Sequence, residues 1–132
     1  MKNTPFNTLP VYRNSLVLRD LSDALAQHFT PDKPVFKSQN IGLRAIIAAS
    51  LATDASLLPE TIEKVYSTTS IDARRKNTTF ISIITKNLVS YCNGLERDGI
   101  KEKEYLQLLR NELRTFRKSF KQWRKSLLND NF

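Results

Sequence analysis

The sequence has few of the residues that turn a chain, only three glycines and five prolines among 132 residues. A fold made of many strands needs frequent turns, so this scarcity argues against strands and favours long helices. Apolar runs are also short, well below the ~20 residues that a membrane-spanning helix needs. The first nine residues lack the apolar core of a secretion signal. We therefore expect a cytoplasmic protein with no membrane partner.

Chemically reactive groups are equally scarce. The chain has one cysteine, Cys92, and one histidine, His28, so it can form no internal disulfide. Both residues fall among apolar neighbours, which predicts a buried Cys92 and a partly buried His28. The carboxylates do not converge at metal-ligand spacing, the glycines form no phosphate-binding loop, and no nucleophile stands beside a base. The sequence therefore predicts a binding protein that is not an enzyme and holds no metal or cofactor.

The clearest pattern lies between residues 101 and 128, where we expect a long helix. Apolar residues recur there at alternating steps of three and four, the heptad spacing that keeps one stripe of a helix against a partner. Core packing is the expected role of the aromatic rings in this stripe, and base stacking is the lesser alternative. We call the stripe the heptad seam; it consists of Leu106, Leu109, Leu113, Phe116, Phe120, Trp123 and Leu127.

Basic residues gather beside the heptad seam. From Arg110 to Lys125 there are seven basic residues and one acidic residue, Glu112. A solvated helix face usually mixes the two signs at i,i+4 spacing, because such pairs stabilise the helix slightly. Like charges placed together cost stability, so we interpret this face as a surface for a polyanion rather than a merely solvated one. Its basic residues are Arg110, Arg114, Arg117, Lys118, Lys121, Arg124 and Lys125.

The charge of the whole chain supports the same interpretation. The formal net charge is +8, and residues 101–132 alone hold nine basic and four acidic side chains, a net charge of +5. A second basic cluster lies in a polar stretch of the chain and consists of Arg74, Arg75 and Lys76. Together with the basic face described above, this cluster makes up the candidate nucleic-acid-binding residues.

Two further helices are expected in the first half of the chain. The first runs from Pro10 to about His28, and the prolines in 31–34 exclude a helix there. The second begins near Ser38, a plausible N-cap, and ends within 52–56.

The next predicted helix is long and runs from Pro59 to about Asn93, with Gly94 as its C-terminal stop. Its middle is polar, and a break at 67–70 with Ser70 as a new N-cap is the alternative to the continuous helix that we expect. Four amphipathic helices with short connections predict an all-α fold, an antiparallel up-down-up-down four-helix bundle. We expect residues 1–132 to form a single domain, with 1–9 and 129–132 flexible at its ends.

Several residues of this pattern resemble a known family. The first predicted helix opens with Leu9-Pro10-Val11-Tyr12 and closes with Phe29-Thr30-Pro31, the third carries Val65-Tyr66 and Arg74, and Trp123 lies among basic residues. Over about residues 9–125 this resembles the four-helix-bundle superfamily of 23S rRNA intervening-sequence proteins, and most closely the accessory variability determinant (Avd) of diversity-generating retroelements. In the family Phe is usually followed directly by Pro, whereas Thr30 intervenes here. The Ser-Ile-x-x-Asn-Ile-Ala-Glu-Gly signature of the ribosomal branch is missing, which favours the Avd branch.

The resemblance implies a non-catalytic accessory protein of a diversity-generating retroelement. Avd-like proteins form a pentamer with a positive surface, bind the element's reverse transcriptase and template RNA, and support mutagenic retrohoming. The implied partners are therefore RNA and/or DNA, a reverse transcriptase and further copies of the chain. Two alternatives stay open: a helical protein-interaction module whose basic face meets an acidic protein, and a ribosome- or rRNA-associated four-helix-bundle protein.

Apolar residues at the edges of the predicted seams also favour a homo-oligomer. These residues are Tyr66, Tyr91, Tyr105 and Leu108. Surplus apolar area at the rim of a bundle usually marks an interface, and a head-to-tail contact that closes gives a ring. The number five comes from the resemblance alone.

Overall fold

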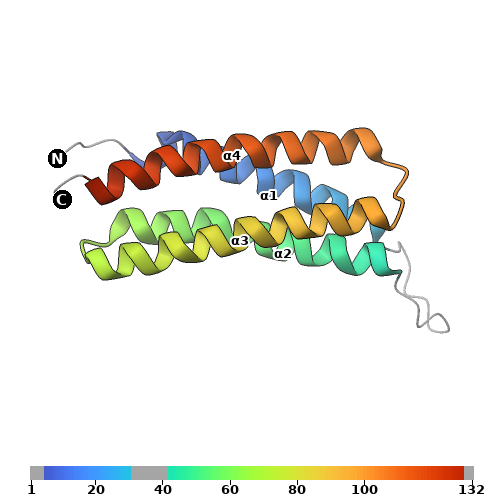
Figure 1. The fold of residues 1–132 in the computed structure, drawn as a ribbon, viewed down its shortest axis with the longest axis horizontal. Helices are drawn as coiled ribbons and strands as arrows, with labels where there is room; N and C mark the ends of the chain where they lie inside the picture. The colour runs from blue at the N-terminus through green and yellow to red at the C-terminus, as the bar shows by residue number, and fades with distance from the viewer. Residues whose placement is uncertain (1–4, 31–41, 130–132) are drawn as a thin grey trace.

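The computed structural model describes residues 5–30 and 42–129, with side chains up to residue 127. Within these residues the chain forms a 3₁₀ turn, η1 (Phe6–Thr8), and the helices α1 (Pro10–Phe29), α2 (Leu43–Ser67), α3 (Ile71–Arg97) and α4 (Lys103–Asn129), without any strand. Each helix runs antiparallel to the next, so that α1 begins and α4 ends at the same end of the bundle (Figure 1). Both α1 and α3 pack against α2 and α4. The predicted all-α, antiparallel up-down-up-down four-helix bundle is confirmed.

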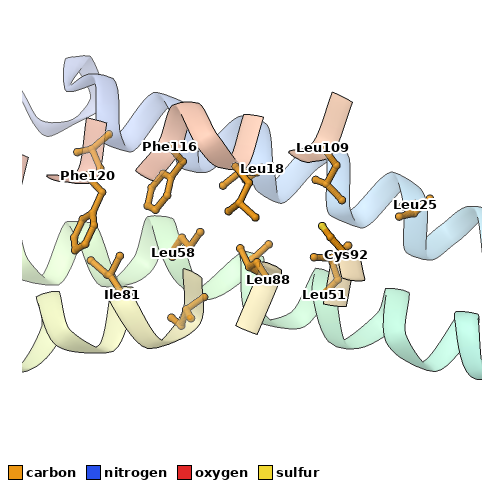
Figure 2. Close-up of a cluster of buried hydrophobic side chains, with 14 of the residues drawn as sticks. Leu18, Leu25, Leu51, Leu58, Ile81, Leu88, Cys92, Leu109, Phe116 and Phe120 are labelled. Atoms are coloured by element: carbon orange, nitrogen blue, oxygen red, sulfur yellow. The ribbon is translucent and has the colours of Figure 1, made fainter. Parts of the chain in front are cut away.

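The heptad seam of α4 closes the hydrophobic core, as its spacing predicts. Leu109 and Phe116 are fully buried, and the rings of Phe116 and Phe120 stack with centroids 6.0 Å apart. Figure 2 shows these side chains reaching the same interior as Leu18 of α1 and Leu58 of α2. Every residue of the seam is buried except Trp123, which is half-buried. Large rings placed at the centre of a bundle bury the most apolar area, so they contribute strongly to stability.

The single cysteine lies in this core. Cys92 is completely buried, as predicted, and burial raises the pKa of its thiol to about 11. A thiol that stays protonated at neutral pH is a poor nucleophile. Cys92 therefore acts as a small apolar residue of the core.

The composition of α2 reflects its place in the core. By length and composition alone α2 is apolar enough to cross a membrane, a test that a core helix also passes. Its apolar side is packed inside the bundle, where Ala48, Leu51, Ala55, Leu58, Ile62 and Val65 are buried. Packing against the other helices therefore accounts for this buried side, whereas Leu43 and Ile46 of the same helix are exposed.

The boundary between α2 and α3 differs from the expected one. Pro59 does not start a helix but lies buried inside α2. The chain leaves the helix at residues 68–70 instead, which is the alternative to the continuous helix that we expected. A proline inside a helix removes a backbone hydrogen bond and costs about 3 kcal/mol. The buried side chains Ala55, Leu58 and Ile62 continue the helical spacing across Pro59, so core packing offsets this cost. At the break, Ser70 caps α3 by accepting a hydrogen bond from the Ala73 amide at 3.2 Å.

The predicted stop at Gly94 is also wrong. The helix α3 continues through Gly94 to Arg97, and the glycine that ends it is Gly99, with φ of +75°. The amide of Gly99 donates to the Glu96 carbonyl at 3.0 Å, and the amide of Ile100 donates to the Leu95 carbonyl at 3.4 Å. These two backbone hydrogen bonds, together with a glycine in the left-handed conformation, form a Schellman motif. Gly94 instead lies where α2 approaches closely, since a Cβ there would lie 3.2 Å from the Ile47 Cδ1 atom.

The start of α1 agrees with the sequence prediction, whereas the start of α2 differs from it. The helix α1 begins at Pro10 as predicted, and the residues before it are not all loose, because η1 forms and the ring of Phe6 packs edge-on against Tyr12 at 4.9 Å. The expected N-cap of α2, Ser38, lies outside the described residues. Gly42, which we expected inside the helix, is the N-cap of α2.

Candidate nucleic-acid interface

A cleft of about 420 Å³ opens between α3 and α4 on the surface of the bundle. These two helices contact each other less than any other neighbouring pair. The α3 residues that border the cleft include Ser82 and Thr85, whose side chains are too short to reach across to α4. The cleft is lined by Ser82, Thr85, Lys86, Arg117, Lys118, Phe120 and Lys121.

One further cation reaches across this cleft. The Arg124 Nη1 atom lies 3.5 Å from the Ser82 Oγ atom, so the guanidinium donates a long hydrogen bond from α4 to α3. We call the cleft together with Arg124 the basic groove. Its five cations are Lys86 from α3 and Arg117, Lys118, Lys121 and Arg124 from α4, and all five are exposed.

The heptad geometry of α4 explains why its cations meet there. Arg117 and Arg124 are seven residues apart, nearly two full turns, so they lie on the same side of the helix. The seam turns the apolar side of α4 inward, and this fixes the neighbouring basic side toward α3. The sequence prediction therefore placed Arg117, Lys118, Lys121 and Arg124 correctly on one surface, and the structure adds which helix they face.

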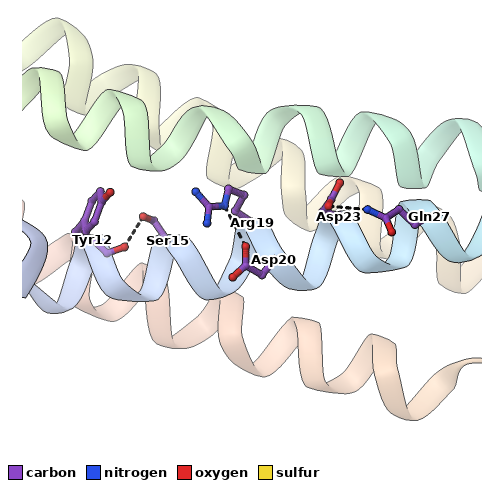
Figure 3. Close-up of polar contacts among 6 residues, drawn as sticks. All are labelled: Tyr12, Ser15, Arg19, Asp20, Asp23 and Gln27. Atoms are coloured by element: carbon purple, nitrogen blue, oxygen red, sulfur yellow. Dashed lines mark hydrogen bonds and ion pairs between the residues drawn. The ribbon is translucent and has the colours of Figure 1, made fainter.

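The charges of the basic groove are not compensated by ion pairs in the described part of the chain. In the described ranges 5–30 and 42–127, no ion pair involves any of its five cations. The outer side of α1 is different: Arg19 pairs with Asp20 at 3.1 Å, and Gln27 donates to Asp23 at 2.9 Å (Figure 3). Five uncompensated charges at one cleft create a positive potential that attracts an anion and lowers stability when no anion is bound.

Two predicted residues flank the groove. Arg114 is exposed on α4 and donates from Nη1 to the Asn111 Oδ1 atom of its own helix at 2.8 Å. Lys125 is exposed one residue beyond Arg124. Both belong to the same basic surface of α4, but neither borders the cleft.

Arg110 does not belong to the free basic surface. Its Nη2 atom lies 2.6 Å from the Glu96 Oε1 atom, and only 23% of its side chain is exposed. The ion pair joins α4 to the end of α3. Glu96 lies far from Arg110 in the sequence, so the spacing of α4 alone gave no sign that this charge would be compensated.

The three residues of the second basic cluster differ in burial. Arg74 is buried, and its Nε atom donates to the Thr68 carbonyl at 3.0 Å, which ties the start of α3 to the turn after α2. Burial lowers the pKa of this guanidinium from its ordinary value. Arg74 therefore supports the fold, and its prediction as a binding residue is not upheld.

The other two residues of that cluster are exposed. Arg75 lies seven residues before Ser82, so it falls on the groove side of α3. Lys76 lies six residues before Ser82, about 120° away around the helix. Arg75 can extend the basic groove, whereas Lys76 belongs to the outer side of α3.

Lys86 is the groove residue that the sequence prediction missed. It stands in a stretch of α3 dominated by apolar residues and has no basic neighbour within several residues along the chain. The available signal was its position four residues after Ser82, on the polar side of α3. Only the antiparallel register of α3 and α4 brings it beside Arg117 and Lys121.

The chain was also compared with known proteins. No protein-family model matches it, and neither does any curated protein or solved structure. The geometry of the basic groove therefore has to carry the functional argument.

Proposed function

We propose that this chain is a non-catalytic accessory protein that binds nucleic acid through the basic groove between α3 and α4. The observation that carries the proposal is the convergence of five exposed cations, without an ion-pair partner in the described part of the chain, on one cleft. Like charges held together cost stability, so their retention is explained by a polyanionic ligand that neutralises them. Phosphate backbones are the most abundant ligands of this kind.

The resemblance to Avd proteins supplies the biological setting of this proposal. In that setting the nucleic acid is a template RNA or the DNA copied from it, and the protein partner is a reverse transcriptase. The chain would support mutagenic retrohoming without taking part in the chemistry. The basic groove is the surface that we assign to the nucleic acid in this assembly.

The dependence of binding on salt tests the proposal. Each phosphate contact contributes about 0.9 to the slope of log affinity against log salt on duplex DNA, so five contacts predict a slope of about 4.5. The variant Lys86→Gln/Arg117→Gln/Lys121→Gln removes three groove cations. Its slope should fall by about 2.7, and its affinity at ~0.1 M salt should fall roughly 10²–10³-fold. Fluorescence anisotropy with a labelled duplex measures both quantities.

A matched control separates the groove from net charge. The variant Arg97→Gln/Lys101→Gln/Lys103→Gln removes the same charge from exposed residues near the α3–α4 turn. It should bind nearly as tightly as the unchanged protein. An equal loss in both variants would show that total charge matters rather than the groove. Equal affinity for poly-glutamate and for nucleic acid would instead support the alternative of an acidic protein partner.

Assembly into a ring is a separate part of the proposal. Two of the tyrosines that suggested an interface are used inside the bundle, because Tyr91 donates to Asp54 at 2.9 Å and Tyr105 donates to the Leu21 carbonyl at 2.6 Å. Exposed apolar side chains are nevertheless present on the outside of the bundle, among them Leu43, Ile46, Phe80, Ile83 and Leu108. We propose that such side chains mediate contacts in a homo-oligomer, with five copies as the resemblance implies. Light scattering that gives the 15.2 kDa mass of a monomer would contradict this.

A further inference from the structure

We propose that the basic groove binds the phosphate backbone of a nucleic-acid duplex and makes no stacking contact with bases. This inference rests on the proposed function and specifies which part of the nucleic acid the groove contacts. Three features of the molecule support it: where the aromatic rings lie, how the cations are spaced, and how the two helices hold them.

The aromatic rings of α4 cannot serve as a stacking platform in the groove. Phe120 lines the cleft but is only 7% exposed, and its ring is engaged with that of Phe116. Trp123 follows Lys121 by two residues, about 200° around the helix, so it lies on the other side of the seam. Proteins that bind single strands without sequence preference rely on accessible rings for stacking. This groove offers cations without such rings.

The exposed aromatic residue of α3 is also turned away. Phe80 is 42% exposed, but it precedes Ser82 by two residues and therefore lies about 200° from it around α3. The groove side of α3 instead presents Ser82 and Lys86, whereas Thr85 is buried and donates its hydroxyl to the Ile81 carbonyl at 2.7 Å. A hydroxyl and an ammonium group are suited to phosphate oxygens. Neither side of the groove is therefore built to hold an unpaired base.

The spacing of the cations matches the charge density of a duplex. Arg117 and Arg124 are seven residues apart, which is about 10 Å along a helix. Over about 10 Å of axis a duplex presents roughly six phosphate charges and a single strand roughly three. Five cations gathered in this distance exceed what a single strand supplies, so a duplex neutralises the groove more completely.

The groove also holds its cations on rigid elements. The helices α3 and α4 are 27 residues long each, and both continue well beyond the groove. A stiff, straight ligand loses little freedom on a stiff surface, whereas a flexible strand must be ordered as it binds. Backbone contacts carry no sequence information by themselves. The expected ligand is therefore a duplex of either sugar type, bound with little regard to sequence.

Three probes of the same strand length test this inference on the full chain: a single strand, its duplex, and an abasic single strand that keeps every phosphate. The abasic strand should bind as tightly as the normal single strand, because no base is stacked. The duplex should bind roughly 10²-fold more tightly at ~0.1 M salt, since five duplex contacts give a salt slope of about 4.5 and three single-strand contacts give about 2.1. The fluorescence of Trp123, the one tryptophan, should change little on binding.

Stacking of bases on the protein would give the opposite result. If bases stack on the protein, removal of the bases should weaken single-strand binding by about 5- to 150-fold for each stacked base, and Trp123 fluorescence should be quenched if its ring takes part. Trp123→Phe is the matched variant, because it keeps an aromatic ring in the seam and should leave affinity unchanged. Binding of the probes with a large abasic loss overturns this inference alone. Failure of all three probes to bind overturns the proposed function as well.

Discussion

Two groups of basic side chains on this bundle differ in whether ion pairs compensate their charge. Near the α3–α4 turn, Arg110 pairs with Glu96 at 2.6 Å and Arg44 with Asp98 at 2.9 Å, and the His28 Nε2 atom lies 2.8 Å from the Glu102 Oε2 atom. Arg97, Lys101 and Lys103 at the same turn are exposed and form no ion pair among the described residues. In the basic groove, toward the other end of α4, five exposed cations share one cleft without such partners in the described part of the chain.

The polar contacts near the turn join helices to the segment between α3 and α4. Arg44 of α2 reaches Asp98 just after α3, both at its carboxylate and, at 3.2 Å, at its carbonyl. His28 of α1 reaches Glu102 just before α4, and this hydrogen bond lowers the pKa of the Glu102 carboxyl while burial acts in the opposite direction. His28 is more exposed than its apolar neighbours predicted, and its partner explains why an exposed imidazole is placed there. These contacts of Arg44 and His28 therefore stabilise the fold.

The unpaired charges of the groove serve no such purpose. Within the described residues, the long Arg124–Ser82 contact is the one hydrogen bond by which they join two helices, and like charges repel one another. The difference between the two groups shows that the number of basic residues says little about function. The basic groove differs from the paired arginines in that several uncompensated cations line one cleft.

The largest expected effect is the loss of stability when the hydrophobic core, which extends through both ends of the bundle, is disrupted. Leu109 lies in the seam near the turn, and Phe116 lies in the seam near the groove; both are fully buried. Each substitution to alanine should leave a cavity and reduce the free energy of unfolding by about 2–5 kcal/mol for Leu109→Ala and 3–5 kcal/mol for Phe116→Ala. Urea denaturation measures both. A loss below ~1 kcal/mol at either position would show that the seam does not form one continuous core.

An intermediate effect separates two neighbouring arginines. Arg74→Ala removes a buried hydrogen bond to the Thr68 carbonyl and should cost about 1–3 kcal/mol of stability. Arg75→Ala changes an exposed side chain and should stay within about 0.5 kcal/mol of the unchanged protein. Thermal denaturation of the two variants side by side makes the comparison. Equal losses would mean that Arg75 also supports the fold, and would remove it from the binding surface.

The smallest expected effects are two changes in stability of opposite sign, one at the basic groove and one at Arg110. Neutralising the groove with Lys86→Gln/Arg117→Gln/Lys121→Gln relieves repulsion and should raise stability by a few tenths of a kcal/mol at low salt. Arg110→Gln breaks an ion pair and should lower stability by about 0.2–1 kcal/mol. Both differences should shrink as added salt screens the charges. Destabilisation of the groove variant would mean that those cations already have partners that stabilise them.

Much of the fold was predictable because its signals are local. The heptad spacing of residues 106–127 fixed the buried side of α4, and the position of the basic face follows from the same spacing. Proline at position 10 marked the start of α1, and the scarcity of turn residues indicated an all-helical chain. Each of these inferences uses residues within a few turns of one another, and helical geometry relates such residues directly.

The helix boundaries were less predictable because local and tertiary preferences compete there. Pro59 is a strong local signal for a helix start, yet the core on both sides of it holds α2 together. Gly94 and Gly99 are both acceptable stops in the sequence, and the close approach of Ile47 together with the positive φ of Gly99 decides between their roles. A prediction from sequence cannot rank these alternatives, because the deciding contacts come from other helices.

By itself, therefore, the sequence determined four amphipathic segments and a strongly basic side of α4. Only the tertiary structure decided which charges remain available. It buried Arg74, paired Arg110 with Glu96, and brought Lys86 of α3 to the groove. The physical reason is that helical periodicity relates residues along one helix, whereas the register between antiparallel helices determines which side chains meet across them. Compensation of charge belongs to the second kind of relation, so the basic groove emerges only when the helices are packed.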